Sequence, residues 1–486
     1  MGSEPDTRNA LAAVVATLLS AAAWWAGSSL QPLWWAAWLA PLPLLAVSTR
    51  LRARWAAVTT FLAFAVGSLN QRHYLVDVLG MPPLALATVA ATVAVAMTAV
   101  VLLFRALALR GRPLAAAFAV PLAGTGLAWL GAAQSPHGTF GNIAYTQMDG
   151  PLVLQVAALA GLWGVGFLVL LGPAALAAAL CARAGPRARL AAGAAGAAVL
   201  VAALVFGAWR LHHDVPVAQQ RVALIDMGSG AGQAADVDSD NGQRLLAGYA
   251  AELERLAAGQ RIDLAVLPES ALLLRERTLL PLQALADRHG MRIVVGVEDH
   301  SGSPLRNSAL VLTPGDPRPQ AYFKRHLVPG FEDRYTPGDS RLLLPGDPAT
   351  AVAICKDLDF TATAREHARL GVQLLAVPAW DFSVDAWMHG RMAAMRGIEG
   401  GFAIARVARD GDLMLSDDRG RMLAEASAVG TQGPVSLVAD LPLRDTRTPY
   451  RLWGDAFGAI CLGLTVLLAA GLLRGRGKHS PRGKRR

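Results

Sequence analysis

Apolar residues gather in long runs in two regions of the chain, and a mixed apolar–polar pattern fills the region between them. Residues 10–209 are dominated by Ala, Leu, Val and Trp, and one more run covers 454–473. A helix needs roughly 20 apolar residues to cross the hydrocarbon core of a bilayer. The pattern therefore predicts eight membrane spans, at residues 10–28, 32–48, 55–69, 83–104, 114–132, 152–180, 190–209 and 454–473.

Two details qualify this prediction. The runs at 32–48 and 55–69 are short, so their ends are poorly defined. The first run could instead be a cleavable signal peptide, which would need a basic leader. Glu4 and Asp6 stand there, which favours a span.

The middle of the chain has the pattern of an α/β domain. Short β-rich runs predict strands at 221–227, 263–269, 292–298, 308–314, 351–357, 372–380 and 402–407, and longer periodic stretches predict helices at 241–258, 278–289 and 386–399. This alternation is typical of a sheet covered by helices. We predict a membrane domain at 1–212 with seven spans, an α/β domain at 213–447, and a last span with a basic tail at 448–486.

Composition and charge agree with a membrane protein. Hydrophobic residues make up 53% of the chain, charged residues 17%, and the mean hydropathy is +0.37, too apolar for an ordinary soluble protein. The net charge of +9 comes from Lys and Arg in alternate connections between spans and in the tail: Arg50, Arg52, Arg54, Arg105, Arg110, Arg112, Arg183, Arg187, Arg189 and seven residues after 473.

The distribution of Lys and Arg also predicts the orientation. The connections on the other side of the spans carry only Arg72. The positive-inside rule therefore predicts both termini in the cytoplasm and the α/β domain on the opposite, periplasmic side. A basic tail could also be a nucleic-acid arm, but its position directly after a span favours the membrane surface. We expect no nucleic-acid partner.

The chain has three cysteines, and only one lies in the α/β domain. Cys181 and Cys461 lie at or inside predicted spans, which leaves Cys355 without a partner for a disulfide. A disulfide framework is therefore excluded for this domain, and Cys355 is a free thiol.

Cys355 is one of three residues whose chemistry fits acyl transfer through a thioester. Glu269 ends the string LAVLPE, Lys324 lies in YFKRHLVPGFE, and Cys355 ends AVAIC. A thiol with a pKa near 8.5 needs a base to become a nucleophile, and Glu269 could be that base if burial raises its pKa. Lys324 and the backbone N–H groups after Cys355 would stabilise the oxyanion. Taken singly, each residue has a plainer interpretation, as a buried thiol, a surface lysine and a turn glutamate.

These motifs resemble those of the nitrilase (carbon–nitrogen hydrolase) superfamily. The matching elements are Pro268-Glu269, the stretch Lys324 to Pro329, and Ala353-Ile354-Cys355. The resemblance implies an αββα sandwich with a Glu–Lys–Cys triad, and Glu332 matches a second glutamate of the family. The eight predicted spans, with the runs 138–168 and 387–407, resemble the membrane branch of the superfamily, the apolipoprotein N-acyltransferases.

This resemblance implies a two-step reaction on lipids. Cys355 would take an acyl chain from a phospholipid, and the thioester would then acylate the α-amino group of a diacylated apolipoprotein. Trp380, Phe382 and Trp387 are candidates for lining the acyl entrance, with ordinary core packing as the alternative. The partners expected are these two substrates and membrane lipid. No metal or organic cofactor is implied.

The chain departs from the family in places that bear on the acceptor. Lys356 and Asp357 stand where the family usually has Tyr and Glu; Lys356 either lowers the pKa of the thiol or points into solvent. The polar family residues after the first strand are replaced at 226–228. The alternatives are a membrane-anchored nitrilase-type amidase or hydrolase, an acyltransferase acting on another amine, and a catalytically silent scaffold.

Three further segments complete the predictions. His389 has no partner at metal-ligand spacing, and residues 417–420 are expected to form a hairpin turn. The loop 326–349, which carries Glu332, could act as a lid. Acyl-chain preference and oligomeric state are not encoded in any motif of the chain.

Overall fold

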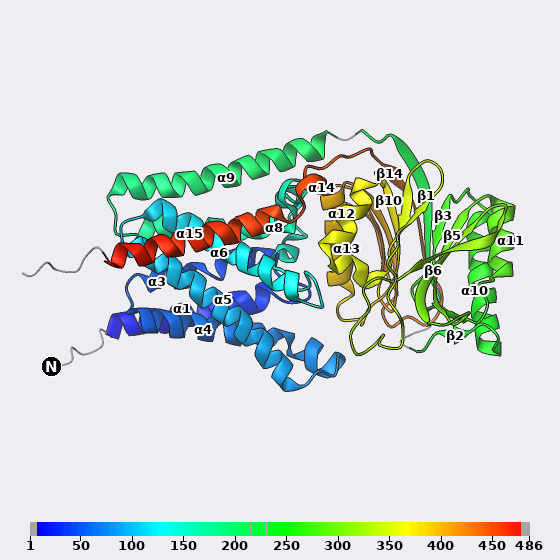
Figure 1. Cartoon of the computed structure of the whole chain (residues 1–486), viewed down its shortest axis with the longest axis horizontal. Coiled ribbons are helices and arrows are strands. Elements are labelled where there is room, and N and C mark those ends of the chain that lie inside the picture. The colour runs from blue at the N-terminus through cyan, green and yellow to red at the C-terminus, as the bar shows by residue number, and fades with distance from the viewer. Residues whose placement is uncertain (1–6, 214, 229–231, 478–486) are drawn as a thin grey trace, which may run out of the picture.

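The computed structural model describes residues 7–213, 215–228 and 232–477 of the chain. An elongated helical bundle forms one half of the molecule and a two-sheet α/β domain the other (Figure 1). Helical residues give way to strands between His212 and Ala218, and strands to helices between Leu443 and Tyr450.

Six helices of the described residues are long and apolar enough to cross a membrane. They are α1 (Thr7–Gly27), α5 (Pro83–Leu109), α6 (Pro113–Gln134), α8 (Ala157–Cys181), α9 (Pro186–His212) and α15 (Ala456–Gly477). Each corresponds to one of the predicted spans, and their exposed Leu, Val and Trp side chains form a lipid-compatible outer surface.

The predicted total of eight spans is not confirmed. The run at 32–48 is divided at Pro41 into α2 (Trp34–Leu39) and α3 (Leu42–Ser48), because proline cannot continue the hydrogen bonding of the preceding helix. The run at 55–69 forms α4 (Ala53–Gly67), which has 15 residues. Both are shorter than a straight crossing requires.

The run at 152–180 is not one continuous helix, although α8 is long enough to span. It begins with α7 (Pro151–Leu154), and α8 is broken at Gly161, which has φ +66°. A Cβ atom at Gly161 would lie 2.5 Å from the Tyr450 ring, so the chain turns where only glycine fits.

The basic connections meet at one end of the bundle. Arg105 donates to the carbonyls of Ser48 and Leu51 at 3.0 and 2.8 Å, the N–H of Arg183 donates to Ala108, and Arg110 donates to Leu472 of α15. The start of α1 and the end of α15 lie at this same end, far from the sheets (Figure 1). The residues that predicted the orientation are thus grouped in space.

The α/β domain is an αββα sandwich, as expected. One sheet has the strand order β14-β1-β3-β5-β4-β2 with β6 and β7 added beyond β5, and the other has the order β13-β12-β11-β10-β9-β8. The first sheet contains β1 (Ala218–Asp226), β2 (Ala235–Asp236), β3 (Leu264–Val266), β4 (Leu272–Leu274), β5 (Arg292–Asp299), β6 (Arg306–Thr313), β7 (Asp316–Phe323) and β14 (Val435–Leu443).

The second sheet contains β8 (Leu342–Leu344), β9 (Thr350–Val352), β10 (Leu374–Trp380), β11 (Ala403–Arg409), β12 (Asp412–Ser416) and β13 (Met422–Ser427). Helices α10 (Asp240–Ala257) and α11 (Leu280–His289) cover the first sheet on the side away from the bundle, while α12 (Thr361–Arg369) and α13 (Ala386–Gly400) lie between the second sheet and the bundle (Figure 1).

One predicted strand is wrong at its end. The run 351–357 is a strand only to Val352, and Cys355–Asp359 forms the short 3₁₀ helix η4. The predicted helices at 241–258, 278–289 and 386–399 correspond to α10, α11 and α13. Residues 417–420 form the turn between β12 and β13, as predicted.

A shared core joins the two halves. Tyr145 and Trp163 of the helical region pack in one buried cluster with Met392 and Ile398 of α13. Arg396 donates to the Tyr145 hydroxyl at 2.9 Å, and Glu399 accepts from the Leu162 N–H at 2.7 Å, where the break at Gly161 frees that donor. The α/β domain is therefore held in a fixed position on the bundle.

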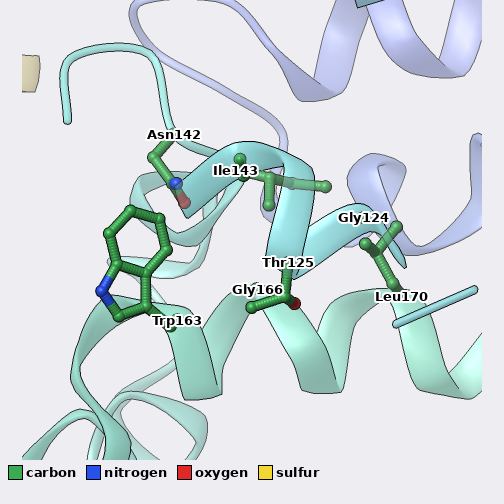
Figure 2. A pocket seen from close by; sticks show the side chains of 8 residues that line it. Gly124, Thr125, Asn142, Ile143, Trp163, Gly166 and Leu170 are labelled. Carbon is green, nitrogen blue, oxygen red and sulfur yellow. The ribbon is translucent and has the colours of Figure 1, made fainter. Parts of the chain in front are cut away.

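A small cavity of about 10 Å³ lies near this junction, between α6 and α8 (Figure 2). Thr125, Trp163 and Gly166 are among its lining residues. The Thr125 hydroxyl is buried and has no hydrogen-bond partner among the residues that the structure describes. A cavity of this size has room for about one water molecule, so it is too small for a lipid.

Candidate active site

Glu269 and Lys324 form a buried ion pair at the carboxyl ends of two strands of the first sheet. Glu269 follows β3 and Lys324 follows β7, and both side chains are almost completely buried. The Lys324 Nζ lies 2.7 Å from Glu269 Oε1. Gly296 of β5 makes room for this arrangement, because a Cβ there would lie 2.4 Å from the Glu269 Cα.

Glu332 and Asn307 complete this ionic cluster. Glu332 Oε2 lies 2.8 Å from Lys324 Nζ and also accepts from the Val328 N–H at 2.6 Å. The Asn307 amide donates to Glu269 Oε1 at 2.6 Å and to Glu332 Oε1. Two carboxylates thus share one ammonium, and Glu269 Oε2 is buried without a hydrogen-bond partner in the described residues. The sequence motifs gave no sign of Asn307.

Cys355 stands at the sharp turn between β9 and η4. Its φ is +42°, an uncommon conformation for a residue other than glycine that is often found at functional sites. The first bond of η4 runs from the Asp357 N–H to the Ile354 carbonyl at 2.9 Å. The N–H of Lys356 precedes that bond, so it is one of the donors that a helix start leaves without an internal acceptor.

The end of β10 brings Cys355 and Glu269 together. The Glu269 N–H donates to the Ala379 carbonyl at 3.2 Å, and the Cys355 thiol donates to the carbonyl of the next residue, Trp380, at 3.6 Å. Residues distant in sequence therefore meet where strands of both sheets end, which is where sites in α/β domains tend to form.

The pKa values of Glu269, Lys324 and Cys355 follow from their burial and from the presence of two carboxylates for one ammonium. Burial raises the pKa of Glu269, the Lys324 ammonium partly opposes this, and Glu332 adds to it. Burial would lower the pKa of Lys324, but the two carboxylates outweigh it and raise the pKa well above its usual value. Burial and the Glu269 charge raise the pKa of the Cys355 thiol. The resting site therefore holds a protonated thiol beside a carboxylate of raised basicity.

Asp357 connects the Cys355 turn to the segment after Lys324. One of its oxygens accepts from the His326 N–H at 2.9 Å, and the other accepts from the Tyr322 hydroxyl at 2.7 Å and the Ile354 N–H at 3.0 Å. Burial raises the pKa of Asp357, but the hydrogen bonds from His326 and Tyr322 outweigh it and lower the pKa overall. Asp357 is therefore placed to hold the turn at Cys355 in position.

Lys356 does not point into solvent, since only 6% of it is exposed. Its ammonium lies 3.4 Å from Asp359 and 3.2 Å from the His137 ring, and it faces the Phe360 ring at 5.9 Å. The contacts of Lys356 are thus with the helical region and with its own turn.

The three candidate aromatic residues lie in different surroundings. Trp380 stacks against the Arg409 guanidinium at 4.6 Å, and Trp387 packs against the shared core and faces Arg391 at 5.2 Å. The Phe382 ring meets that of Phe331 edge-on at 5.0 Å, and Phe331 is 50% exposed. Phe331 belongs to the loop 326–349, so the Phe382 ring connects this loop to the residues that follow β10.

A second buried ionic cluster, which the sequence analysis missed, follows β10. Asp381 pairs with Arg406 through both oxygens, at 3.0 Å for one of them. His389 Nδ1 lies 3.4 Å from both Asp381 and Asp385. The expectation that His389 has no partner at metal-ligand spacing is therefore wrong, because Asp385 precedes it by one helical turn. Burial would lower the pKa of His389, but the two carboxylates raise it to about 10.

These three side chains place their ligand atoms within 4.8 Å of one another, as a metal site would. Two cations of the protein, Arg406 and protonated His389, already balance the two carboxylates. A divalent ion would have to displace Arg406 and deprotonate His389, so the donor set does not fit a metal.

Comparison with known proteins gives the family. Residues 221–448 match the carbon-nitrogen hydrolase model, and residues 20–175 match the model of the apolipoprotein N-acyltransferase N-terminal domain. The chain belongs to the apolipoprotein N-acyltransferase family. Its helical region is therefore that of a multi-pass inner-membrane protein.

Two of its relatives are proteins named apolipoprotein N-acyltransferase. The protein of Bradyrhizobium diazoefficiens is 30% identical over 66% of this chain and 66% of the relative. The protein of Pasteurella multocida is 28% identical over 45% of this chain and 47% of its own length. The chain thus spans about half the length of some curated relatives that it matches.

Two solved structures match about half of the chain each. An amidase from Nesterenkonia sp. has 21% identity and a TM-score of 0.39 over 47% of this chain and 93% of its own. A carbon-nitrogen hydrolase from Helicobacter pylori G27 has 18% identity and a TM-score of 0.39 over 49% of this chain and 94% of its own.

Proposed function

We propose that this protein transfers a fatty acyl chain from a phospholipid to the α-amino group of the diacylglyceryl-cysteine of apolipoproteins, through a thioester on Cys355. The observation that carries the proposal is the buried cluster of Glu269, Lys324 and Glu332 beside Cys355, in a chain of this family. Glu269 Oε2 is the unpartnered acceptor that a general base needs.

In the first step, the Cys355 thiol gives its proton to Glu269, and the thiolate attacks the ester carbonyl of the phospholipid. Once Glu269 has taken the proton, its negative charge no longer raises the pKa of the Cys355 thiol. The thiolate is therefore easier to form than it would be beside a charged Glu269. The oxyanion is held by the Lys324 ammonium and the Lys356 N–H. The alkoxide of the lysophospholipid leaves and takes the proton back from Glu269.

In the second step, the amine of the apolipoprotein attacks the thioester. Glu269 accepts a proton from the attacking nitrogen, and the same oxyanion donors stabilise the tetrahedral intermediate. The Cys355 thiolate leaves and is reprotonated by Glu269. The products are an amide and the free thiol, and no cofactor is consumed.

The lipid substrates require a site at the bilayer surface. The grouped basic connections at the far end of the bundle support cytoplasmic termini and a catalytic domain on the periplasmic side. Five long helices precede the domain; counting α2–α3 and α4 as two further crossings gives seven, which is also an odd number. Either number leaves the domain on the side opposite Thr7.

The aromatic pair Phe331–Phe382 is the part of the site best placed to meet an acyl chain. Phe331 is half exposed on the loop 326–349, which also supplies Glu332 to the ionic cluster. Movement of this loop would open the entrance and disturb the charges around Lys324 at the same time. We assign Trp380 a supporting role through Arg409, and Trp387 a role in packing the junction.

The test is a mass measurement on the full-length protein. Purified protein is incubated with phosphatidylethanolamine and a synthetic diacylated lipopeptide, with Cys355→Ala as the inactive control. Gain of one acyl chain by the lipopeptide, preceded by an acyl adduct on Cys355, is the expected result. Release of free fatty acid without lipopeptide acylation would make the protein a hydrolase, and absence of any adduct would make it a scaffold.

A further inference from the structure

The junction between the catalytic domain and the last membrane helix exposes apolar side chains. Helix α14 (Tyr450–Trp453) lies just before α15, and its last two residues, Leu452 and Trp453, are 66% and 54% exposed. The Trp453 indole N–H donates a hydrogen bond to the Leu159 carbonyl at 2.6 Å. A Leu–Trp pair at the start of a span belongs at the headgroup level of the bilayer.

Two arginines of α12 converge on this junction. Arg365 donates to the Leu452 carbonyl at 2.8 Å and to the Arg451 carbonyl at 3.4 Å. Arg369 donates to the same two carbonyls, at 3.2 and 3.1 Å. Arg451 itself adds a third positive charge from α14. We call these three residues the junction arginines.

The junction arginines have no carboxylate partner among the residues that the structure describes. Glu366, the nearest carboxylate along α12, pairs with Arg325 and Arg341. Asp455 accepts from Tyr450, Trp163 and Thr361 instead. With three positive charges on two neighbouring helices and no carboxylate to pair with them, the junction is a place where an anion would be stabilised.

Capping of α14 explains only part of this arrangement. Cations near the C-terminal carbonyls of a helix are favourable, which accounts for the bonds of Arg365 and Arg369. It does not account for Arg451, whose side chain makes no hydrogen bond or ion pair within the described residues. It also does not account for the exposed Leu452 and Trp453 beside the charges.

We propose that the junction arginines bind the phosphate of an anionic phospholipid and so hold the catalytic domain against the bilayer. Arg365 and Arg369 use Nε and Nη2 on the carbonyls, which leaves Nη1 of each without a partner in the described part of the chain. Guanidinium donors match phosphate geometry well. The bilayer is the source of this phosphate because Leu452 and Trp453 place the site at the headgroup layer.

The experiment measures lipid retained by the full-length protein in native mass spectra. All proteins carry Cys355→Ala, so that no lipid is consumed. Phosphatidylglycerol is titrated against phosphatidylcholine with the same acyl chains. The variants are Arg451→Gln, the double variant Arg365→Gln/Arg369→Gln, and the control Arg261→Gln/Arg288→Gln, which removes two exposed arginines far along the chain from the junction.

We expect retention of phosphatidylglycerol in preference to phosphatidylcholine. Each positive charge near a membrane surface contributes about a fivefold effect on binding, so Arg451→Gln should weaken retention about fivefold and the double variant about 25-fold. The control should retain the lipid as the parent does. Arg451→Gln leaves the cap of α14 in place, so it tests the proposal even if the double variant does not fold.

Three results would overturn the proposal. The first is equal retention by the parent and Arg451→Gln, and the second is an equal loss in the control, which would indicate a non-specific charge effect. The third is stabilisation by inorganic phosphate that Arg451→Gln abolishes, without any retained lipid, because the ligand would then be a free anion. Acyl adduct formation on Cys355 is measured separately, so failure here does not decide the proposed reaction.

Discussion

Two buried ionic clusters flank Cys355, and they differ in charge balance. The first has two carboxylates, Glu269 and Glu332, for one ammonium, Lys324. The second has two carboxylates, Asp381 and Asp385, for two cations, Arg406 and His389. The first is short of one positive charge and contains an unpartnered oxygen on Glu269, whereas the second is neutral as it stands.

This difference in charge balance indicates that the first cluster takes part in the reaction and that the second one supports the structure. A cluster with surplus negative charge holds a carboxylate whose pKa is raised, and such a group can take up a proton during a reaction. A balanced cluster gains nothing from a further proton. Because Asp381 follows Trp380, whose carbonyl accepts from the Cys355 thiol, the second cluster can act by holding that carbonyl in place. Removing single members of each cluster tests this interpretation.

The largest effect should come from Glu269→Gln. A general base usually contributes at least about a hundredfold to the rate, and the amide cannot accept the thiol proton. We expect adduct formation on Cys355 to fall by that factor or more, without a change in melting temperature. The control is Glu276→Gln, an exposed glutamate in the same domain. Near-normal adduct formation in Glu269→Gln would remove it from the mechanism.

A change in the balanced cluster should instead affect stability. Arg406→Met leaves the buried Asp381 carboxylate without its partner, which typically costs about 3–5 kcal/mol. The expected result is a large drop in the melting temperature in detergent. Arg391→Met is the matched control, since its partner Glu425 is 34% exposed and such pairs contribute about 0–1 kcal/mol. Equal, small effects would contradict the assignment.

Glu332→Gln should have a smaller effect on activity than Glu269→Gln. It removes one charge-assisted contact to Lys324, worth about 1.5–3 kcal/mol, or about 10–100-fold in rate. Because the charge of Glu332 raises the pKa of Glu269, its loss lowers that pKa. The acidic limb of the pH–rate profile should therefore move to lower pH. A rate loss with an unmoved limb would limit Glu332 to positioning Lys324.

The mildest change should be the pH dependence contributed by His389. Its pKa is raised to about 10 in the folded protein, above the usual value of about 6.5. The stability that protonation provides is therefore complete below about pH 6.5, declines as the pH rises, and is lost above about pH 10. The difference in melting temperature between the parent and His389→Gln should shrink from pH 6 to pH 10. A difference that grows over this range would contradict the charged form.

The fold could be predicted in outline because its signals are local. Apolar runs long enough to cross a bilayer predicted the six long helices, and short β-rich runs predicted the central strands of the sandwich. The strands that escaped prediction include β2, β4 and β8, which have two or three residues, and β13, whose exposure alternates along its length. Short or half-exposed strands are held by pairing with neighbours, which no local pattern records.

The residues of the candidate active site differ in the same way. Glu269, Lys324 and Cys355 stand out in sequence because each lies in a recognisable motif. Asn307, which connects both carboxylates of the first cluster, lies in an ordinary strand segment and gave no signal. The sequence also left open whether Lys356 points into solvent, and burial against Asp359 and His137 excludes this.

Local patterns along the chain were enough to predict a membrane protein with an α/β domain and a thiol, an ammonium and a carboxylate suited to acyl transfer. Which charges meet could be seen only in the folded molecule. There, two carboxylates lie on Lys324, Arg406 balances Asp381, and the junction arginines have no carboxylate partner among the described residues. The physical reason is that hydrophobicity is a property of each residue along the chain, whereas a charge has an energy only in relation to the partners and the water around it.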